Sequence, residues 1–93
     1  MIQTFRAKVL QRFWEKDDRR GLRPDWVVRI GYLLDALDHA ARPEDLNLPG
    51  FGFHVLVGNH KGRYALTVSR NWRITFEFVE GQAVQIDLED YHG

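Results

Sequence analysis

The sequence predicts an α+β fold in which two N-terminal helices pack on a mostly antiparallel sheet of four to five strands. Apolar residues recur at helical spacing in the first half of the chain, and from residue 53 they alternate with polar residues. The first pattern is typical of helices and the second of strands. The 93 residues are 44% hydrophobic and 28% charged, which indicates one compact domain spanning residues 1–93.

Two helices are predicted in the first half of the chain, after a short β-prone segment at residues 2–5. The first spans residues 7–16, and a polar turn at residues 17–21 is expected to end it at a glycine. Pro24 suits the first position of the second helix, which is expected to end before Pro43. The apolar stripes are Val9, Leu10, Phe13 and Trp14 in the first helix, and Trp26, Val27, Ile30, Leu33, Leu34 and Leu37 in the second.

The second half of the chain predicts an antiparallel meander. Residues 54–57 form a short apolar segment, and three longer stretches then alternate between an apolar and a polar face, which indicates strands with one face on the core and one in water. The turn at residues 80–81 is a hairpin signal. The apolar positions are Tyr64, Leu66 and Val68, then Trp72, Ile74, Phe76 and Phe78, and finally Val84, Ile86 and Leu88.

The same alternation predicts where Arg73 points. It lies between Trp72 and Ile74, so if these two residues face the helices, Arg73 and Thr75 face the open side of the sheet. An arginine on an exposed concave sheet face is suited to bind phosphate.

Charge is unevenly distributed along a chain whose 13 basic and 13 acidic residues sum to zero. Residues 46–76 hold four basic residues, two histidines and no acid, whereas residues 77–93 hold five acids and no lysine or arginine. Zero net charge by itself argues against a nucleic-acid partner. Electrostatic potential follows local arrangement, however, so the acid-free stretch allows a cationic surface that faces a polyanion, with chance clustering on solvated strands as the alternative.

Several functional classes find no support in the sequence. There is no cysteine, which excludes a disulfide scaffold and thiolate metal sites and fits a reducing, cytoplasmic compartment. The four histidines have no metal-ligand spacing, no phosphate-binding glycine loop is present, and no apolar run approaches a membrane span. We therefore expect no metal, no cofactor and no membrane contact. Acid/base chemistry remains open, and the titratable segment Asp90-Tyr91-His92 is where to look for it, with a frayed polar end as the alternative.

Three segments together resemble a known family. They are Gly62-Arg63-Tyr64 with Thr67-Val68, the run from Asn71 to Phe76 (NWRITF), and Asp90-Tyr91-His92. In this combination the chain resembles the HigB branch of the RelE-like toxins, the plasmid maintenance killer proteins of bacterial toxin–antitoxin modules. The resemblance covers nearly the whole chain.

The resemblance implies a RelE-like fold and an endoribonuclease that cuts messenger RNA in the A site of the 30S subunit of a translating ribosome. It also implies a partner, a HigA-type antitoxin with a helix-turn-helix, through which alone the toxin would reach operator DNA. Metal-free cleavage fits the residue types, because RNA supplies its own nucleophile, the 2′-hydroxyl. The protein must then only move two protons and stabilise charge on the phosphorane.

Roles for individual residues follow from this implied reaction. His92 and His54 would be the acid and the base, in either order, and Arg73 would grip two phosphate oxygens. Tyr91 would contact a base or ribose, and Asp90 would orient His92 or hold its charged form. The predicted RNA-binding residues are Lys61, Arg63, Arg70 and Asn71, whereas His39 and His60 are interpreted as surface or loop histidines.

Two departures from the family pattern keep other functions open. Family members often carry lysine at the position of Val57 and a basic residue at the position of Ser69. The first alternative is therefore a RelE-fold protein that has lost cleavage and acts mainly by binding its antitoxin as a corepressor. The second is an unrelated α+β interaction domain in which the resembling segments are coincidental.

Overall fold

The computed structural model describes residues 1–91, in which both α-helices precede four strands. The elements are α1 (Lys8–Lys16), α2 (Val27–His39), β1 (His54–Val55), β2 (Tyr64–Thr67), β3 (Trp72–Val79) and β4 (Gln82–Asp90). Three short 3-10 helices are η1 (Pro24–Trp26), η2 (Pro43–Leu46) and η3 (Gly58–His60). Within the described residues, no helix is long and apolar enough to cross a membrane.

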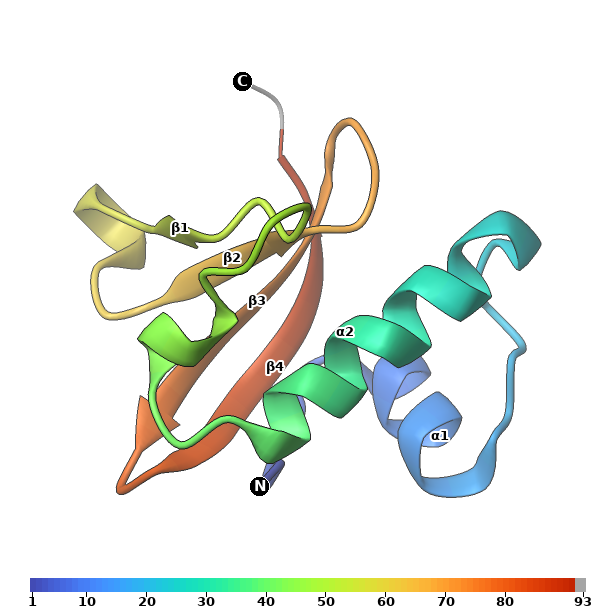
Figure 1. The fold of residues 1–93 in the computed structure, drawn as a ribbon. Helices are drawn as coiled ribbons and strands as arrows, with labels where there is room; N and C mark the ends of the chain where they lie inside the picture. The colour runs from blue at the N-terminus through green and yellow to red at the C-terminus, as the bar shows by residue number, and fades with distance from the viewer. Residues whose placement is uncertain (92–93) are drawn as a thin grey trace.

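The four strands form one antiparallel sheet in the order β1-β2-β3-β4, and the two helices lie against one of its faces (Figure 1). Both residues of the turn 80–81 have positive φ angles, which is the hairpin geometry that matches the twist of the flanking strands. The N-terminal segment adds two parallel bridges to β4, Ile2 with Ala83 and Phe5 with Ile86. The predicted fold, two helices on a mostly antiparallel sheet, is confirmed.

The hydrophobic core lies between α2 and the sheet. The predicted stripe of the second helix is buried except for Val27, which is partly buried. In contrast, α1 buries only Leu10 completely and packs the rest of its stripe at the edge of the core. The second helix starts later than predicted, because the Val27 N–H bonds to the Pro24 carbonyl and tightens the first turn into η1. The fully buried hydrophobic residues of α2, β3 and β4 are Ile30, Leu33, Leu34, Leu37, Ile74, Phe76, Ala83 and Ile86.

The end of α1 differs from the prediction of a glycine stop. The helix ends at Lys16, and Asp17 adopts the left-handed conformation with φ 51° while its N–H bonds to the Phe13 carbonyl. Aspartate tolerates this conformation better than most residues. Gly21 comes later, where the chain turns with φ +88° so close to α1 that a Cβ would lie 2.8 Å from Val9 Cγ2.

The face of the sheet opposite the helices is more buried than the alternation of residues predicts. Thr75 lies on the side opposite Ile74 and Phe76, yet it is fully buried. Arg63, only 5% exposed, covers it and donates from Nη2 to Thr75 Oγ1 at 2.8 Å. The centre of β3 is therefore buried on both faces, by apolar side chains on one and by a guanidinium on the other.

Replacing Leu34 by alanine tests the position of the core. We expect Leu34→Ala to lower the free energy of unfolding by about 2–5 kcal/mol, because it removes a fully buried side chain and leaves a cavity. Urea denaturation followed by circular dichroism measures the change. The matched control is Val28→Ala on the same helix, where the side chain is 85% exposed and a change within about 0.5 kcal/mol is expected. Equal effects of the two substitutions would contradict the assigned core face of α2.

Candidate active site

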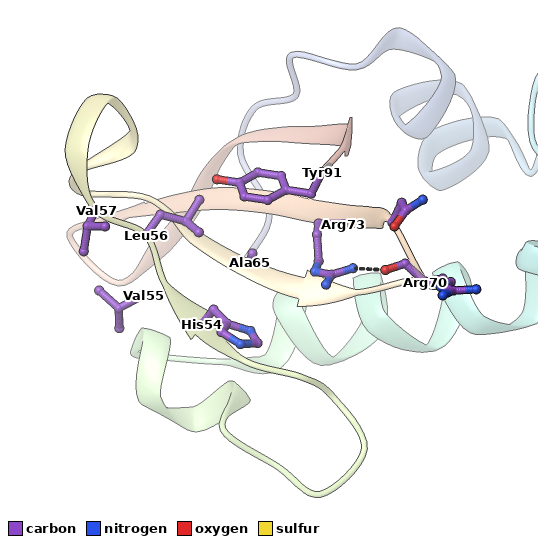
Figure 2. A pocket seen from close by; sticks show the side chains of 9 residues that line it. His54, Val55, Leu56, Val57, Ala65, Arg70, Arg73 and Tyr91 are labelled. Atoms are coloured by element: carbon purple, nitrogen blue, oxygen red, sulfur yellow. Dashed lines mark hydrogen bonds between the residues drawn. The ribbon is translucent and has the colours of Figure 1, made fainter. Parts of the chain in front are cut away.

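A cleft of about 520 Å³ opens beside β1 on the face of the sheet that carries Arg73 (Figure 2). The apolar groups come from β1, the residues after it and β2, whereas the polar groups come from the start of β1, the loop between β2 and β3, β3 itself and the residue after β4. The apolar lining is Val55, Leu56, Val57 and Ala65, and the polar lining is His54, Arg70, Asn71, Arg73 and Tyr91.

Strand register brings His54 and Arg73 to one face of the sheet. His54 pairs with Ala65, and Thr67, two residues further along β2, pairs with Arg73. Residues paired across strands share a face, as do residues two apart on one strand. Arg73 also pairs with Glu89 of β4, so the acid-free and the acidic segments of the chain meet at this site.

His54 is exposed, and its ring is oriented by a single short contact. Its Nδ1 lies 2.6 Å from the carbonyl oxygen of Gly52. A carbonyl oxygen only accepts hydrogen bonds, so this contact places a proton on Nδ1. In the neutral imidazole Nε2 is then the nitrogen with a free lone pair, which is the form that a general base requires.

The Arg73 guanidinium is anchored at one end. Its Nη1 donates to the carbonyl oxygens of Ser69, Arg70 and Trp72 at 3.0, 3.2 and 3.3 Å. These bonds hold the half-buried side chain against the β2–β3 loop, as Figure 2 shows for the Arg70 carbonyl. The permanent cation is thereby fixed at the edge of the cleft.

Tyr91 stands between the cleft and a second, smaller hollow. Its N–H donates to the Asn71 carbonyl at 2.5 Å, and its ring lies 5.9 Å from the His60 ring, tilted by 51°. The second hollow is about 300 Å³ and is lined by His60, Glu89, Asp90 and Tyr91. His60 is half-buried at the end of η3. No local signal in the sequence indicated its contact with Tyr91, because that contact depends on the path of the β1–β2 connection.

His39, Lys61 and His92 lie in three separate parts of the chain. His39 is exposed at the end of α2, where bonding of its Nδ1 to the Asp35 carbonyl and the nearby Asp35 carboxylate raise the pKa of the imidazole. Lys61 is exposed immediately after η3. His92 lies outside the described residues, and so does the predicted contact between it and Asp90.

Arg63, predicted to bind RNA, is buried in the sheet, and its contacts favour a structural role instead. Its guanidinium donates to Glu77 Oε2 at 2.9 Å, to Thr75 Oγ1 and to the Gln85 carbonyl, both at 2.8 Å. The Thr75 hydroxyl in turn donates to Glu89 Oε2. A cation that is 5% exposed and held by two neighbouring strands is not free to contact a phosphate.

The groups that line the cleft are suited to proton transfer and to binding an anion. They include an imidazole, two guanidinium groups, a phenol and a side-chain amide. Across residues 1–91, no three histidine, aspartate or glutamate side chains gather closely enough to hold a metal ion.

Comparison with known proteins agrees with this architecture. The family model described as RelE-like toxin of type II toxin-antitoxin system HigB matches residues 3–92. Endoribonuclease HigB of Proteus vulgaris is 39% identical over 99% of this chain and 100% of its own length, and Toxin HigB-1 of Vibrio cholerae serotype O1 is 33% identical over 98% of each. A chain in the solved YoeB-YefM complex from Staphylococcus aureus has the same fold, with a TM-score of 0.59, 14% identity, and coverage of 100% of this chain and 99% of its own.

The fold and the family match together identify the class of protein. The chain is a RelE-like toxin of a type II toxin–antitoxin system, and within that class it belongs to the HigB-like family.

A comparison of two arginines tests whether Arg63 has a structural role. We expect Arg63→Ala to lower the free energy of unfolding by about 3–5 kcal/mol, because it leaves Glu77 and Thr75 without their buried partner. Arg70→Ala, at an exposed cleft position, is expected to change it by about 0.5 kcal/mol or less. Urea denaturation measures both, and Arg63→Lys serves as a milder variant. Unchanged stability of Arg63→Ala together with weaker RNA binding would instead support the predicted RNA-binding role of Arg63.

Proposed function

We propose that this chain is an endoribonuclease that cleaves messenger RNA in the A site of a translating ribosome, acting as one toxin domain over residues 1–93. The observation that carries the proposal is the cleft in which an oriented imidazole, an anchored guanidinium and a tyrosine meet. The name Endoribonuclease HigB of the Proteus vulgaris relative supports the same activity.

The proposed reaction is metal-free attack of the RNA 2′-hydroxyl on the adjacent phosphate. The step needs a base for the hydroxyl, an acid for the departing 5′-oxygen and a cation for the phosphorane. His54 and His92 take the acid and base roles, and either order remains open. The proton that the Gly52 carbonyl keeps on Nδ1 of His54 leaves Nε2 to face the substrate.

Arg73 is proposed to stabilise the charge on the phosphorane. Among the described residues, every hydrogen bond that the Arg73 guanidinium donates comes from Nη1. Its Nε and Nη2 are therefore left to donate to two phosphate oxygens. A guanidinium that is already anchored loses little conformational freedom when it binds, which favours stabilisation of the transition state.

Tyr91 and Asp90 complete the proposed site. The Tyr91 ring borders the cleft and offers a flat surface on which a base can stack. Asp90, on the same segment, is proposed to orient His92 or to favour its charged form. Arg70 and Asn71, on the cleft wall, and the exposed Lys61, directly after η3, are the proposed contacts with the RNA backbone.

The small number of cations at the site supports the proposed dependence on the ribosome. Arg70 and Arg73 line the cleft, and the chain as a whole has zero net charge. Affinity for naked RNA grows with the number of phosphates neutralised, and two or three contacts give little. A ribosome that holds the message in place would supply the positioning that this surface lacks. Action on the ribosome in turn implies a cytoplasmic site of action.

A HigA-type antitoxin is the proposed partner. The family description names a type II toxin–antitoxin system, and the structural neighbour is a YoeB-YefM complex. We propose that operator DNA is contacted only through this antitoxin.

A second candidate function is antitoxin binding and corepression with weakened cleavage. Val57 is 80% exposed at the cleft, at the position where family members often carry lysine. Arg63 is buried and does not compensate, whereas Arg70 lines the cleft and supplies one replacement cation.

Removal of the His92 imidazole tests the catalytic assignment. We expect His92→Ala to relieve growth arrest on expression and to slow message cleavage by about 10²–10⁴-fold, the usual contribution of a general acid or base. Primer extension on messages from a translation extract, with and without ribosomes, measures cleavage. His39→Ala, an exposed histidine on α2, is the control and should remain toxic. An equally toxic His92→Ala protein would show that this histidine is not catalytic.

Restoring the cation at Val57 separates the two candidate functions. If the chain is an active nuclease with one cation missing, Val57→Lys should increase the cleavage rate by roughly tenfold, or about 1.4 kcal/mol of transition-state stabilisation. Val28→Lys adds the same charge to an exposed position of α2 and should change nothing. Absence of ribosome-dependent cuts with the parent, and appearance of cuts with Val57→Lys, would favour the corepressor as the native role.

A further inference from the structure

The loop before β1 is clamped to α2 by Arg29. Its Nη2 donates to the Gly50 carbonyl at 2.6 Å and to the Thr67 carbonyl at 2.8 Å, and its Nε donates to the Thr67 carbonyl at 3.1 Å. One guanidinium therefore joins α2, the 50–53 loop and the end of β2. Five donors in a rigid plane make arginine suited to such a bridge.

Phe51 completes the clamp. Its side chain is 3% exposed, with the Arg29 guanidinium 6.0 Å from the ring centroid and the Tyr32 ring packed edge-on at 5.6 Å. Its carbonyl accepts the Thr67 N–H at 2.9 Å. Two side chains from successive turns of α2 thus fix the loop residue that immediately precedes Gly52.

Gly52 lies between Phe51, which is held by Arg29 and Tyr32, and the segment that carries His54. It has a φ angle of +62°, and a Cβ at this position would overlap the Thr67 hydroxyl and lie 2.9 Å from Thr67 Cβ. The loop backbone therefore lies flush against β2, and in this position the Gly52 carbonyl meets His54 Nδ1 at 2.6 Å. Both residues of β1 are exposed, so this hydrogen bond, rather than packing, sets the orientation of the imidazole.

We propose that Arg29 is a positioning residue for His54. By holding the 50–53 loop against β2, it fixes the Gly52 carbonyl, which keeps the proton on Nδ1 of His54 and directs Nε2 to the cleft. The catalytic consequence rests on the proposed function, in which His54 acts on RNA. The effect on the imidazole itself does not depend on that function.

An arginine near an RNA-binding cleft has an obvious alternative role, which is contact with a phosphate. The geometry favours positioning, because the recorded donor contacts of the half-buried Arg29 go to the backbone carbonyls of Gly50 and Thr67. The two roles also predict different behaviour of a lysine substitution. Lysine keeps the charge that attracts phosphate but lacks the planar fork that spans two carbonyls.

The experiment compares wild type, Arg29→Ala and Arg29→Lys as full-length chains. Nitrogen-15 NMR of the imidazoles reports the tautomer of His54, whose signals are identified by their loss in His54→Gln. We expect the Nδ1-protonated neutral form in wild type and a mixture of tautomers in both Arg29 variants. In ribosome-dependent cleavage, kcat should fall by about tenfold to a hundredfold in both variants with KM within twofold of wild type.

Arg12→Ala is the matched control, since it removes an exposed arginine from α1 and should leave both measurements unchanged. Thermal unfolding shows whether each variant is folded. If Arg29→Ala does not fold, the proposal is decided by Arg29→Lys, which keeps the aliphatic part of the side chain. An unchanged tautomer in a folded Arg29→Lys would overturn the proposal. So would wild-type kcat in Arg29→Lys with a raised KM in Arg29→Ala, which indicates a phosphate contact. If wild type itself cleaves nothing, the proposed function fails, and the NMR comparison still decides whether Arg29 positions His54.

Discussion

The buried guanidinium of Arg63 is the interaction on which the rest of the sheet depends. It reaches from the start of β2 to Thr75 and Glu77 on β3 and to the Gln85 carbonyl on β4. The Gln85 carbonyl is available because this residue adopts φ 54° where the β3–β4 register shifts. A slip of either strand by one residue would leave a buried cation without its partners, which is far more costly than a slip in an apolar sheet. The register fixed in this way also aligns His54, Arg73 and the end of β4.

Much of this arrangement follows from the periodicity of the sequence. The helical stripe of α2, the hairpin at residues 80–81 and the face of Arg73 can each be predicted, because each depends on local spacing alone. The exception is Arg63, which has the same polar alternation as any solvent-exposed strand residue. Arg63 is buried because Thr75 and Glu77, on another strand, supply its hydrogen-bond partners. An interaction between two strands cannot be read from the spacing of residues along either one. The contact of His60 with Tyr91 and the clamp on Phe51 escape prediction for the same reason.

The site also shows how a neutral chain can hold a cationic cleft. Its basic residues before β2, in the β2–β3 loop and on β3 differ in how deeply they are buried and in which acidic residues lie beside them. The buried Arg63 pairs with the half-buried Glu77 of β3, whereas Arg70 is exposed at the rim of the cleft. Burial therefore removes one cation from the surface and leaves others beside Tyr91. The net charge of zero conceals this separation, because it counts a buried ion pair and an open guanidinium alike.

The docking of the N-terminal segment on β4 has a consequence for the order of folding. Gln85 N–H bonds to Thr4 Oγ1 across 81 residues of sequence, and Ile2 and Phe5 bridge to the same strand. Contacts of such separation form late and slow the search for the native topology. A nascent chain without β4 lacks both the partner of its first residues and the Gln85 carbonyl that Arg63 requires. The cleft therefore acquires its full set of lining residues only after β4 has been made, because Tyr91 follows that strand directly.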